Sequence, residues 1–160
     1  MDHLPDSVVR RWFNEVWNNG REQAIHQLMA PDALIHGLGD EIMIGPAQFV
    51  AYFRKIHTAL RPIEVTVVRT VVDGEMVAAH CHVTARHAGP SLGPPTGCTV
   101  DFWGMIMARV VDGQIVEGWN CFDMLSMYQQ IGWVTNPVAP VCGGRQSARG
   151  GRAEYRMAVW

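Results

Sequence analysis

The spacing of apolar residues changes at Pro62, and this change constrains the fold more than any other feature of the chain. Before Pro62, apolar side chains recur every three or four residues, which is typical of helices that bury one face. After it, long runs rich in β-branched residues predict strands. Two Asp-Gly pairs, Asp73-Gly74 and Asp112-Gly113, divide these runs and are typical of hairpin turns. The chain is therefore predicted to have an α+β fold, with helices on one face of a curved antiparallel sheet.

Three helices are predicted in the first part of the chain. The first begins at Asp6, which can cap it, and ends at Asn18-Asn19-Gly20; its apolar stripe comprises Val9, Trp12, Phe13, Val16 and Trp17. A short second helix ends at Pro31, and a third runs from Gly45-Pro46 to Pro62.

The predicted strands are Ala33 to His36, Ile63 to Val72, Met76 to His87, Thr99 to Val111 and Gln114 to Phe122. A final helix follows Asp123. Helices packed on a strongly twisted sheet leave a cone-shaped space, and the six tryptophans and nine methionines of the chain suit the lining of an apolar cavity. We therefore predict a cone-shaped, curved antiparallel sheet with three to four helices that enclose a hydrophobic pocket.

The length of 160 residues, 48% of them apolar, is that of one compact domain. We place this domain at residues 1–133 and interpret residues 134–160, rich in Gly, Pro and Arg, as a C-terminal tail. The end of that tail is apolar enough to dock on a dimer mate.

Charge and patterning exclude several classes of partner. The net charge is −2 and no basic run precedes Arg145, so we expect no nucleic-acid partner. No apolar stretch approaches the roughly 18 residues of a membrane helix, so we expect no membrane partner. No signal-peptide pattern is visible at the N-terminus, so we expect a cytoplasmic protein. The four cysteines are irregularly spaced, without a C-x-x-C pair, and are predicted to be free thiols.

Three segments, in order along the chain, resemble those of one family. His87-Ala88-Gly89 followed by Gly93-Pro94-Pro95-Thr96-Gly97 is similar to its H-x-G…P-P-T-G loop, one residue shorter here. The hairpin from Asp112 to Trp119 is similar to D-G-K-I-V-E-x-W, and the stretch from Phe122 to Gly132 is similar to D-x-L…Q-Q-L-G. Over roughly residues 5–133, the chain thus resembles the SnoaL-like polyketide cyclase (ester cyclase) family of the nuclear transport factor 2-like superfamily.

The resemblance implies an α+β cone with a deep pocket and, as in several members, intramolecular aldol ring closure without a cofactor. It also leads us to expect a homodimer and a small hydrophobic carbonyl ligand. In the family, an Asp near the end of the last strand acts as acid and base within a Trp-Asp step. That step reads Trp119-Asn120 here, and the nearest remaining carboxylate is Asp123.

Cofactor-free aldol closure needs a base beside a carbonyl, donors for the enolate and an acid for the new alkoxide. Asp123 is the predicted acid/base, with the N-cap of the last helix as the alternative interpretation. His87 and Asn120 are predicted to orient the substrate or to donate hydrogen bonds to it. His87 closes an apolar row of its strand, and its alternative role is to anchor the loop that follows.

The predicted substrate-binding side chains are Trp12, Trp17, His36, Phe53, His57, Trp103, Met105 and Trp119. Each of them also suits a structural position in the core or on the surface. His80 and His82 have the H-x-H spacing of a metal pair, but they lie on the strand face opposite His87 and no third ligand is evident. We predict no metal and no cofactor.

Two other classes of function stay open. The same cavity could support double-bond isomerisation, dehydration or epoxide opening. Alternatively, the protein is a non-catalytic module for ligand binding or dimerisation, which the absence of the Trp-Asp carboxylate favours. A carboxylate or histidine that faces the cavity would favour an enzyme.

Overall fold

A computed structural model describes residues 4–135 of the chain. Its helical half agrees with the predicted stripes: α1 (Pro5–Arg11) continues directly into η1 (Trp12–Asn18), a wider π-helical segment, and is followed by α2 (Glu22–Leu28) and α3 (Gly45–Ala59). The predicted cap is wrong, because Asp6 lies inside the first turn and Leu4 occupies the N-cap position without a side-chain bond.

The sheet contains β1 (Met29–His36), β2 (Met43–Ile44), β3 (Leu60–Asp73), β4 (Met76–His87), β5 (Thr99–Val111) and β6 (Gln114–Phe122), in the spatial order β2-β1-β6-β5-β4-β3. All neighbouring pairs are antiparallel except β1 and β6, which run parallel. The α+β class is confirmed, but the sheet is mixed rather than wholly antiparallel.

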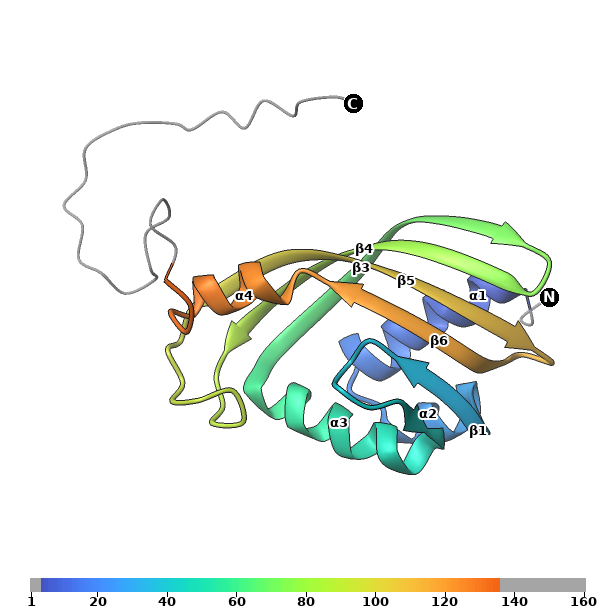
Figure 1. The fold of residues 1–160 in the computed structure, drawn as a ribbon, viewed down its shortest axis with the longest axis horizontal. Coiled ribbons are helices and arrows are strands. Elements are labelled where there is room, and N and C mark those ends of the chain that lie inside the picture. The colour runs from blue at the N-terminus through green and yellow to red at the C-terminus, as the bar shows by residue number, and fades with distance from the viewer. Residues whose placement is uncertain (1–3, 136–160) are drawn as a thin grey trace, which may run out of the picture.

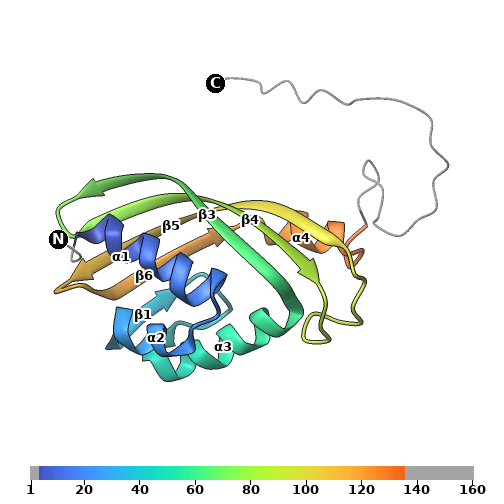
Figure 2. The ribbon, with the colours of Figure 1, turned by 180° about the vertical axis from the view of Figure 1, so that it is seen from behind.

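The helices α1, α2 and α3 lie on one side of the curved sheet (Figures 1 and 2). Burial along the strands follows from this arrangement, since alternate side chains point to opposite faces. On β5 every second residue from Val100 to Val110 is buried, whereas Trp103, Met105 and Met107 are exposed on the outer face. The core therefore occupies the space between the inner face of the sheet and the three helices.

The short helix α4 (Met124–Gln130) closes one end of this space. Asp123 caps it, with Oδ1 accepting a hydrogen bond from the Ser126 backbone N–H at 2.9 Å. The Gln130 side chain joins α4 to β5, accepting from the Asp101 N–H at 2.8 Å and donating to the Asp101 carbonyl at 2.7 Å.

The cysteines differ from the prediction at one described position. Cys81 is buried and Cys121 exposed, both as free thiols, whereas Cys98 is disulfide-bonded, so the prediction of a free thiol is wrong for Cys98. Burial raises the pKa of Cys81 to about 11, which makes this thiol a poor nucleophile at neutral pH.

The predicted tail falls almost wholly outside the described residues. Within residues 4–135, no helix is long and apolar enough to cross a membrane.

Candidate functional site

A cavity of about 450 Å³ lies between the helices and the inner face of the sheet. Its wall is mostly apolar, and every layer of the fold contributes to it. The helices contribute Val9, Trp12, Phe13 and Trp17 from α1 and η1, Phe49, Tyr52, Lys55 and Ile56 from α3, and Met124 and Tyr128 from α4. The sheet contributes, among others, Ile35, Val83, Phe102, Ile106, Asn120 and Phe122, and the loops contribute Leu38, Asp40 and Leu92. The predicted hydrophobic pocket is present, and it is large enough for a small organic ligand.

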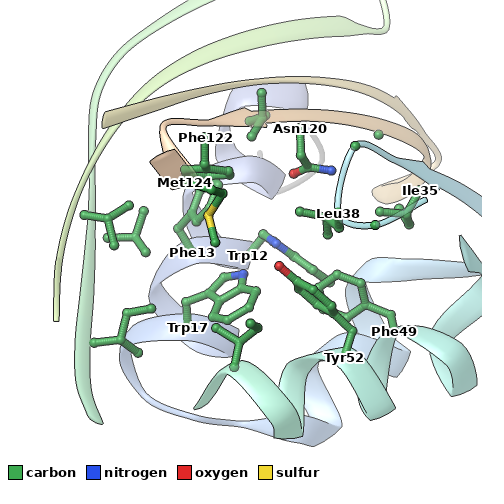
Figure 3. Close-up of a pocket in the computed structure, with 18 of the residues that line it drawn as sticks. Trp12, Phe13, Trp17, Ile35, Leu38, Phe49, Tyr52, Asn120, Phe122 and Met124 are labelled. Carbon is green, nitrogen blue, oxygen red and sulfur yellow. The ribbon is translucent and has the colours of Figure 1, made fainter. Parts of the chain in front are cut away.

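Aromatic rings from two helical segments build one side of the cavity (Figure 3). Trp12 and Trp17 both meet Phe49 edge to face, with ring centroids 5.0 and 6.2 Å apart. Such pairs are rigid and bury a large apolar area. Trp12 and Trp17 were predicted to line the pocket, and the structure places both of them there.

Asn120 is the predicted polar residue that the structure brings to the cavity. Its Nδ2 donates to the backbone carbonyl of His36 at 2.9 Å, which fixes the orientation of the amide. Gly37 makes this contact possible, because a Cβ at that position would collide with the Asn120 backbone carbonyl. Among the described residues nothing bonds Asn120 Oδ1, so the amide offers an acceptor to the cavity (Figure 3).

Two tyrosines supply phenol groups to the same cavity. Burial raises the pKa of Tyr52 to about 12, with a smaller contribution from the charge of Tyr128. Tyr52 therefore stays a neutral hydrogen-bond donor at physiological pH.

Opposite charges flank the cavity at its exposed border. Asp40, in the loop after β1, and Lys55, on α3, are both exposed lining residues. Asp40 is the one carboxylate among the residues that line this cavity, and within residues 4–135 neither Asp40 nor Lys55 forms an ion pair. Both charges are therefore free to meet a ligand that enters.

The other two predicted catalytic residues do not line the cavity. Asp123 is exposed and serves as the cap of α4, the alternative interpretation of this residue. His87 lies on the inner face but is 0% exposed, and its Nδ1 accepts from the Thr96 N–H at 3.3 Å and contacts Thr96 Oγ1 at 3.1 Å. The ring thus anchors the loop after β4, while its Nε2 has no partner among the described residues.

Four predicted substrate-binding residues are on the wrong side of the sheet. Trp103 and Met105 belong to the exposed row of β5. His36 stacks on Trp119 with ring centroids 5.4 Å apart, and its Nε2 lies 3.0 Å from Glu117 Oε1. None of the four lines the cavity, because the strand alternation directs them outward.

Phe53 and His57 belong to the packing of α3 rather than to the cavity wall. Phe53 is buried against Trp17, with centroids 5.6 Å apart. His57 packs on Phe53 at 5.0 Å and covers Gly20. The prediction that these two side chains line the pocket is therefore wrong, since Phe53 lies against Trp17 of η1 and His57 lies against Gly20 in the turn that follows η1.

The H-x-H pair packs on an aromatic ring. His80 and His82 lie 4.8 and 4.5 Å from Trp103, measured between ring centroids, and His82 Nε2 is 2.8 Å from Asp101 Oδ1. Over residues 4–135, no group of three His, Cys, Asp or Glu side chains is arranged to hold a metal ion.

Asp40, Tyr52, Lys55 and Tyr128 line the cavity but were not among the predicted site residues. Tyr52 follows Phe49 by three residues and Lys55 follows Tyr52 by three, so helical spacing alone could have placed both beside the apolar stripe. Asp40 lies in a Gly-rich loop, where no periodic signal predicts direction.

Comparisons with known proteins agree with the fold. The family model for SnoaL-like polyketide cyclases matches residues 7–131. Among solved structures, a candidate SnoaL-like polyketide cyclase from Jannaschia sp. CCS1 is 26% identical, with a TM-score of 0.72 over 78% of this chain and 89% of that chain. IdmH, a candidate polyketide cyclase from Streptomyces antibioticus, is 27% identical, with a TM-score of 0.71 over 81% of this chain and 99% of that chain.

An LEH-like epoxide hydrolase from M. tuberculosis shares the fold at 18% identity, with a TM-score of 0.62 over 78% of this chain and 86% of that chain. No curated protein matches the chain. The family model spans most of the described residues, and two of these neighbours share the fold and about a quarter of the sequence. The chain therefore belongs to the SnoaL-like polyketide cyclase family.

Proposed function

We propose that this protein catalyses intramolecular ring closure of a small, largely apolar carbonyl compound. The observation that carries the proposal is the combination of an aromatic cavity of about 450 Å³ with a few polar groups at its wall and border. The Asn120 oxygen would accept a hydrogen bond from a substrate hydroxyl, and Trp12 and Trp17 would hold a planar ring system.

Asp40 is the proposed base. Its carboxylate would remove a proton from the carbon beside a substrate carbonyl, leaving an enolate. The enolate carbon then bonds to the carbon of a second carbonyl in the same molecule, and the resulting alkoxide recovers the proton from Asp40. No atom is gained or lost in this sequence, so it needs no further reactant. Asp40 takes this role because the family's carboxylate position is Asn120, whose amide cannot act as a base.

Exchange of ketone α-protons with solvent tests proton removal directly. The α-protons of an aryl ketone such as 2-acetylnaphthalene exchange in D2O when an enolate forms, and proton NMR follows the exchange rate. We expect the protein to accelerate exchange, and Asp40→Asn to lower the catalysed rate by roughly 10²–10⁴, the usual effect of losing a positioned base. Binding of the ketone, measured by tryptophan fluorescence, should be retained.

Asp32→Asn is the matched control, because Asp32 is an exposed carboxylate on β1 outside the cavity wall. It should leave the exchange rate unchanged. An equal loss in both variants would remove Asp40 from the mechanism.

Ligand binding without catalysis is the second candidate function. Asn120 stands where the family carries its Asp, and Asp123 is used as a helix cap. A protein that binds the ketone but exchanges its α-protons no faster than buffer would favour this candidate over the cyclase.

A further inference from the structure

Tyr52 and Tyr128 reach the cavity from different helices, α3 and α4. They lie close enough for the charge of one to influence the other. In the described part of the chain neither phenol hydroxyl forms a hydrogen bond with a protein group. Two phenol donors are thus left without a protein acceptor at a mostly apolar wall, where they can donate to a ligand.

Each phenol ring is fixed by a neighbouring ring. Tyr52 packs on Phe49 one helical turn away, with centroids 6.0 Å apart. Tyr128 stacks on Trp133 with centroids 5.4 Å apart and an interplanar angle of 9°. Trp133 in turn lies against Gly93, where a Cβ would meet its indole ring at 2.7 Å. Fixed donors stabilise a developing charge more than mobile ones, because they need no reorganisation when it forms.

The protonation state of Tyr52 suits the donation of a hydrogen bond. Since burial raises the pKa of Tyr52 to about 12, its phenol keeps its proton across the physiological range. Figure 3 shows the Tyr52 hydroxyl directed into the cavity from α3, while the Asn120 side chain enters from β6. The cavity therefore presents a donor and an acceptor from different walls, and the charged Asp40 and Lys55 stay at its border.

We infer that Tyr52, assisted by Tyr128, binds the carbonyl oxygen of the substrate and stabilises the negative charge that forms on it. This inference rests on the proposed function, since it assigns a place to the oxygen of the proposed enolate. It also defines the ligand: a neutral, mainly planar molecule with a carbonyl oxygen toward the tyrosines and a hydroxyl group toward Asn120.

The test uses naphthols, whose ionised oxygen imitates an enolate. A series of substituted 2-naphthols of graded acidity is titrated into the protein, and naphtholate fluorescence reports the bound anion. In the wild type, affinity should rise with naphthol acidity. Tyr52→Phe should weaken binding of the most acidic member by roughly 10- to 100-fold, as expected for loss of a hydrogen bond to a charged group. Tyr128→Phe should have a smaller effect in the same direction.

The neutral hydrocarbon 2-methylnaphthalene is the matched control ligand, because it has the same ring system without the oxygen. It should bind wild type and Tyr52→Phe equally well, which excludes a general change in cavity shape. Equal dependence of affinity on naphthol acidity in wild type and Tyr52→Phe would overturn the inference.

This measurement is independent of turnover. A protein that binds naphtholates through Tyr52 but exchanges no α-protons would refute the cyclase proposal and leave the donor site standing. Equally fast α-proton exchange in wild type and Tyr52→Phe would refute the donor site and leave the cyclase proposal standing.

Discussion

Asn120 illustrates how one side chain decides what a cavity can do. Its amide is held by the His36 carbonyl, so its oxygen is a fixed acceptor. An amide orients a ligand but neither gains nor loses a proton in the physiological pH range, unlike the carboxylates and imidazoles that serve as acid and base. In the proposed ring closure, proton transfer must then come from another group, and Asp40 is the carboxylate among the residues that line the cavity.

Asp123 gives a prediction about stability. Its Oδ1 caps α4 through the Ser126 N–H, so Asp123→Ala should lower the free energy of unfolding by about 1 kcal/mol. Asp123→Asn should leave it nearly unchanged, since Asn caps helices about as well as Asp. Urea unfolding checks both values. If Asp123→Asn kept the stability but slowed α-proton exchange by roughly 10²-fold or more, the size of a lost acid/base contribution, Asp123 would belong to the chemistry.

The sequence predicted least well which face of the sheet each side chain of the site points to. Alternation correctly separated His87 from His80 and His82 on β4. It could not say which of the two rows on β5 and β6 faces the helices, because both rows contain large apolar residues such as Phe102 and Trp103. Of the predicted residues on β5 and β6, Trp103, Met105 and Trp119 therefore prove to lie in outward-facing rows, whereas Asn120 lines the cavity. Only packing of the helices against the sheet fixes this choice.

At the scale of elements, η1 is joined to the edge of the sheet by one side chain. Asn18 Nδ2 donates to the Val65 carbonyl at 3.0 Å, and Asn18 Oδ1 accepts from the Val65 N–H at 2.7 Å. Since β3 is an outermost strand, the amide takes the place of a neighbouring strand and covers two backbone groups that would otherwise be unpaired. The same contact positions Trp17, the preceding residue, at the cavity wall.

Asn18→Ala should therefore lower the free energy of unfolding by about 1–3 kcal/mol, the range for leaving partly buried backbone groups unsatisfied. Asn19→Ala is the control, because the Asn19 side chain forms no hydrogen bond among the described residues. Chemical denaturation compares the two variants. Equal stability of both would show that water replaces the amide at no cost.

The elements themselves could largely be predicted. The change of period at Pro62 and the two Asp-Gly turns placed α3 and the strands β3 to β6 close to their observed bounds. The parallel pairing of β1 with β6 could not be predicted, because their partner residues, such as Leu34 and Glu117, are far apart in sequence. β1 also begins at Met29 despite Pro31, which falls where the pairing with β6 is irregular and no ladder bond is needed.

On the scale of the whole molecule, the helices within residues 4–135 lie over one face of the sheet and leave the other face uncovered by the described residues (Figures 1 and 2). The other face carries Trp103, Met105 and Met107 in one row of β5, each between 45% and 55% exposed. On β6, Cys121 pairs with Met105, and Trp119 pairs with Met107. An apolar surface of this extent is typical of an interaction site. We propose that a second copy of the chain covers it, in agreement with the homodimer expected from the family resemblance.

The charges on either side of the apolar part of this row favour a two-fold arrangement. Asp101 and Arg109 flank Trp103, Met105 and Met107 in the exposed row of β5, with Met105 midway between the two charges. A two-fold axis that lies in the interface at Met105, perpendicular to the strand, would place Asp101 of each copy near Arg109 of the other. It would also stack the apolar centres of the two copies on each other. The contacts of Asp101 with His82 at 2.8 Å and of Arg109 with Glu75 at 3.8 Å lie at the surface and are compatible with this pairing.

Sedimentation over a range of protein concentrations tests the dimer. Met105→Glu should convert it to a folded monomer, because the carboxylate would be buried without a partner at the centre of the interface. Leu125→Glu, at a residue that is 57% exposed on α4, should leave the dimer intact.

Asp101→Arg should weaken association by placing like charges together, and adding Arg109→Asp should restore it, since the exchanged charges again face each other. A double variant as weak as Asp101→Arg would contradict the two-fold axis through Met105, and a monomeric wild type would contradict the dimer itself.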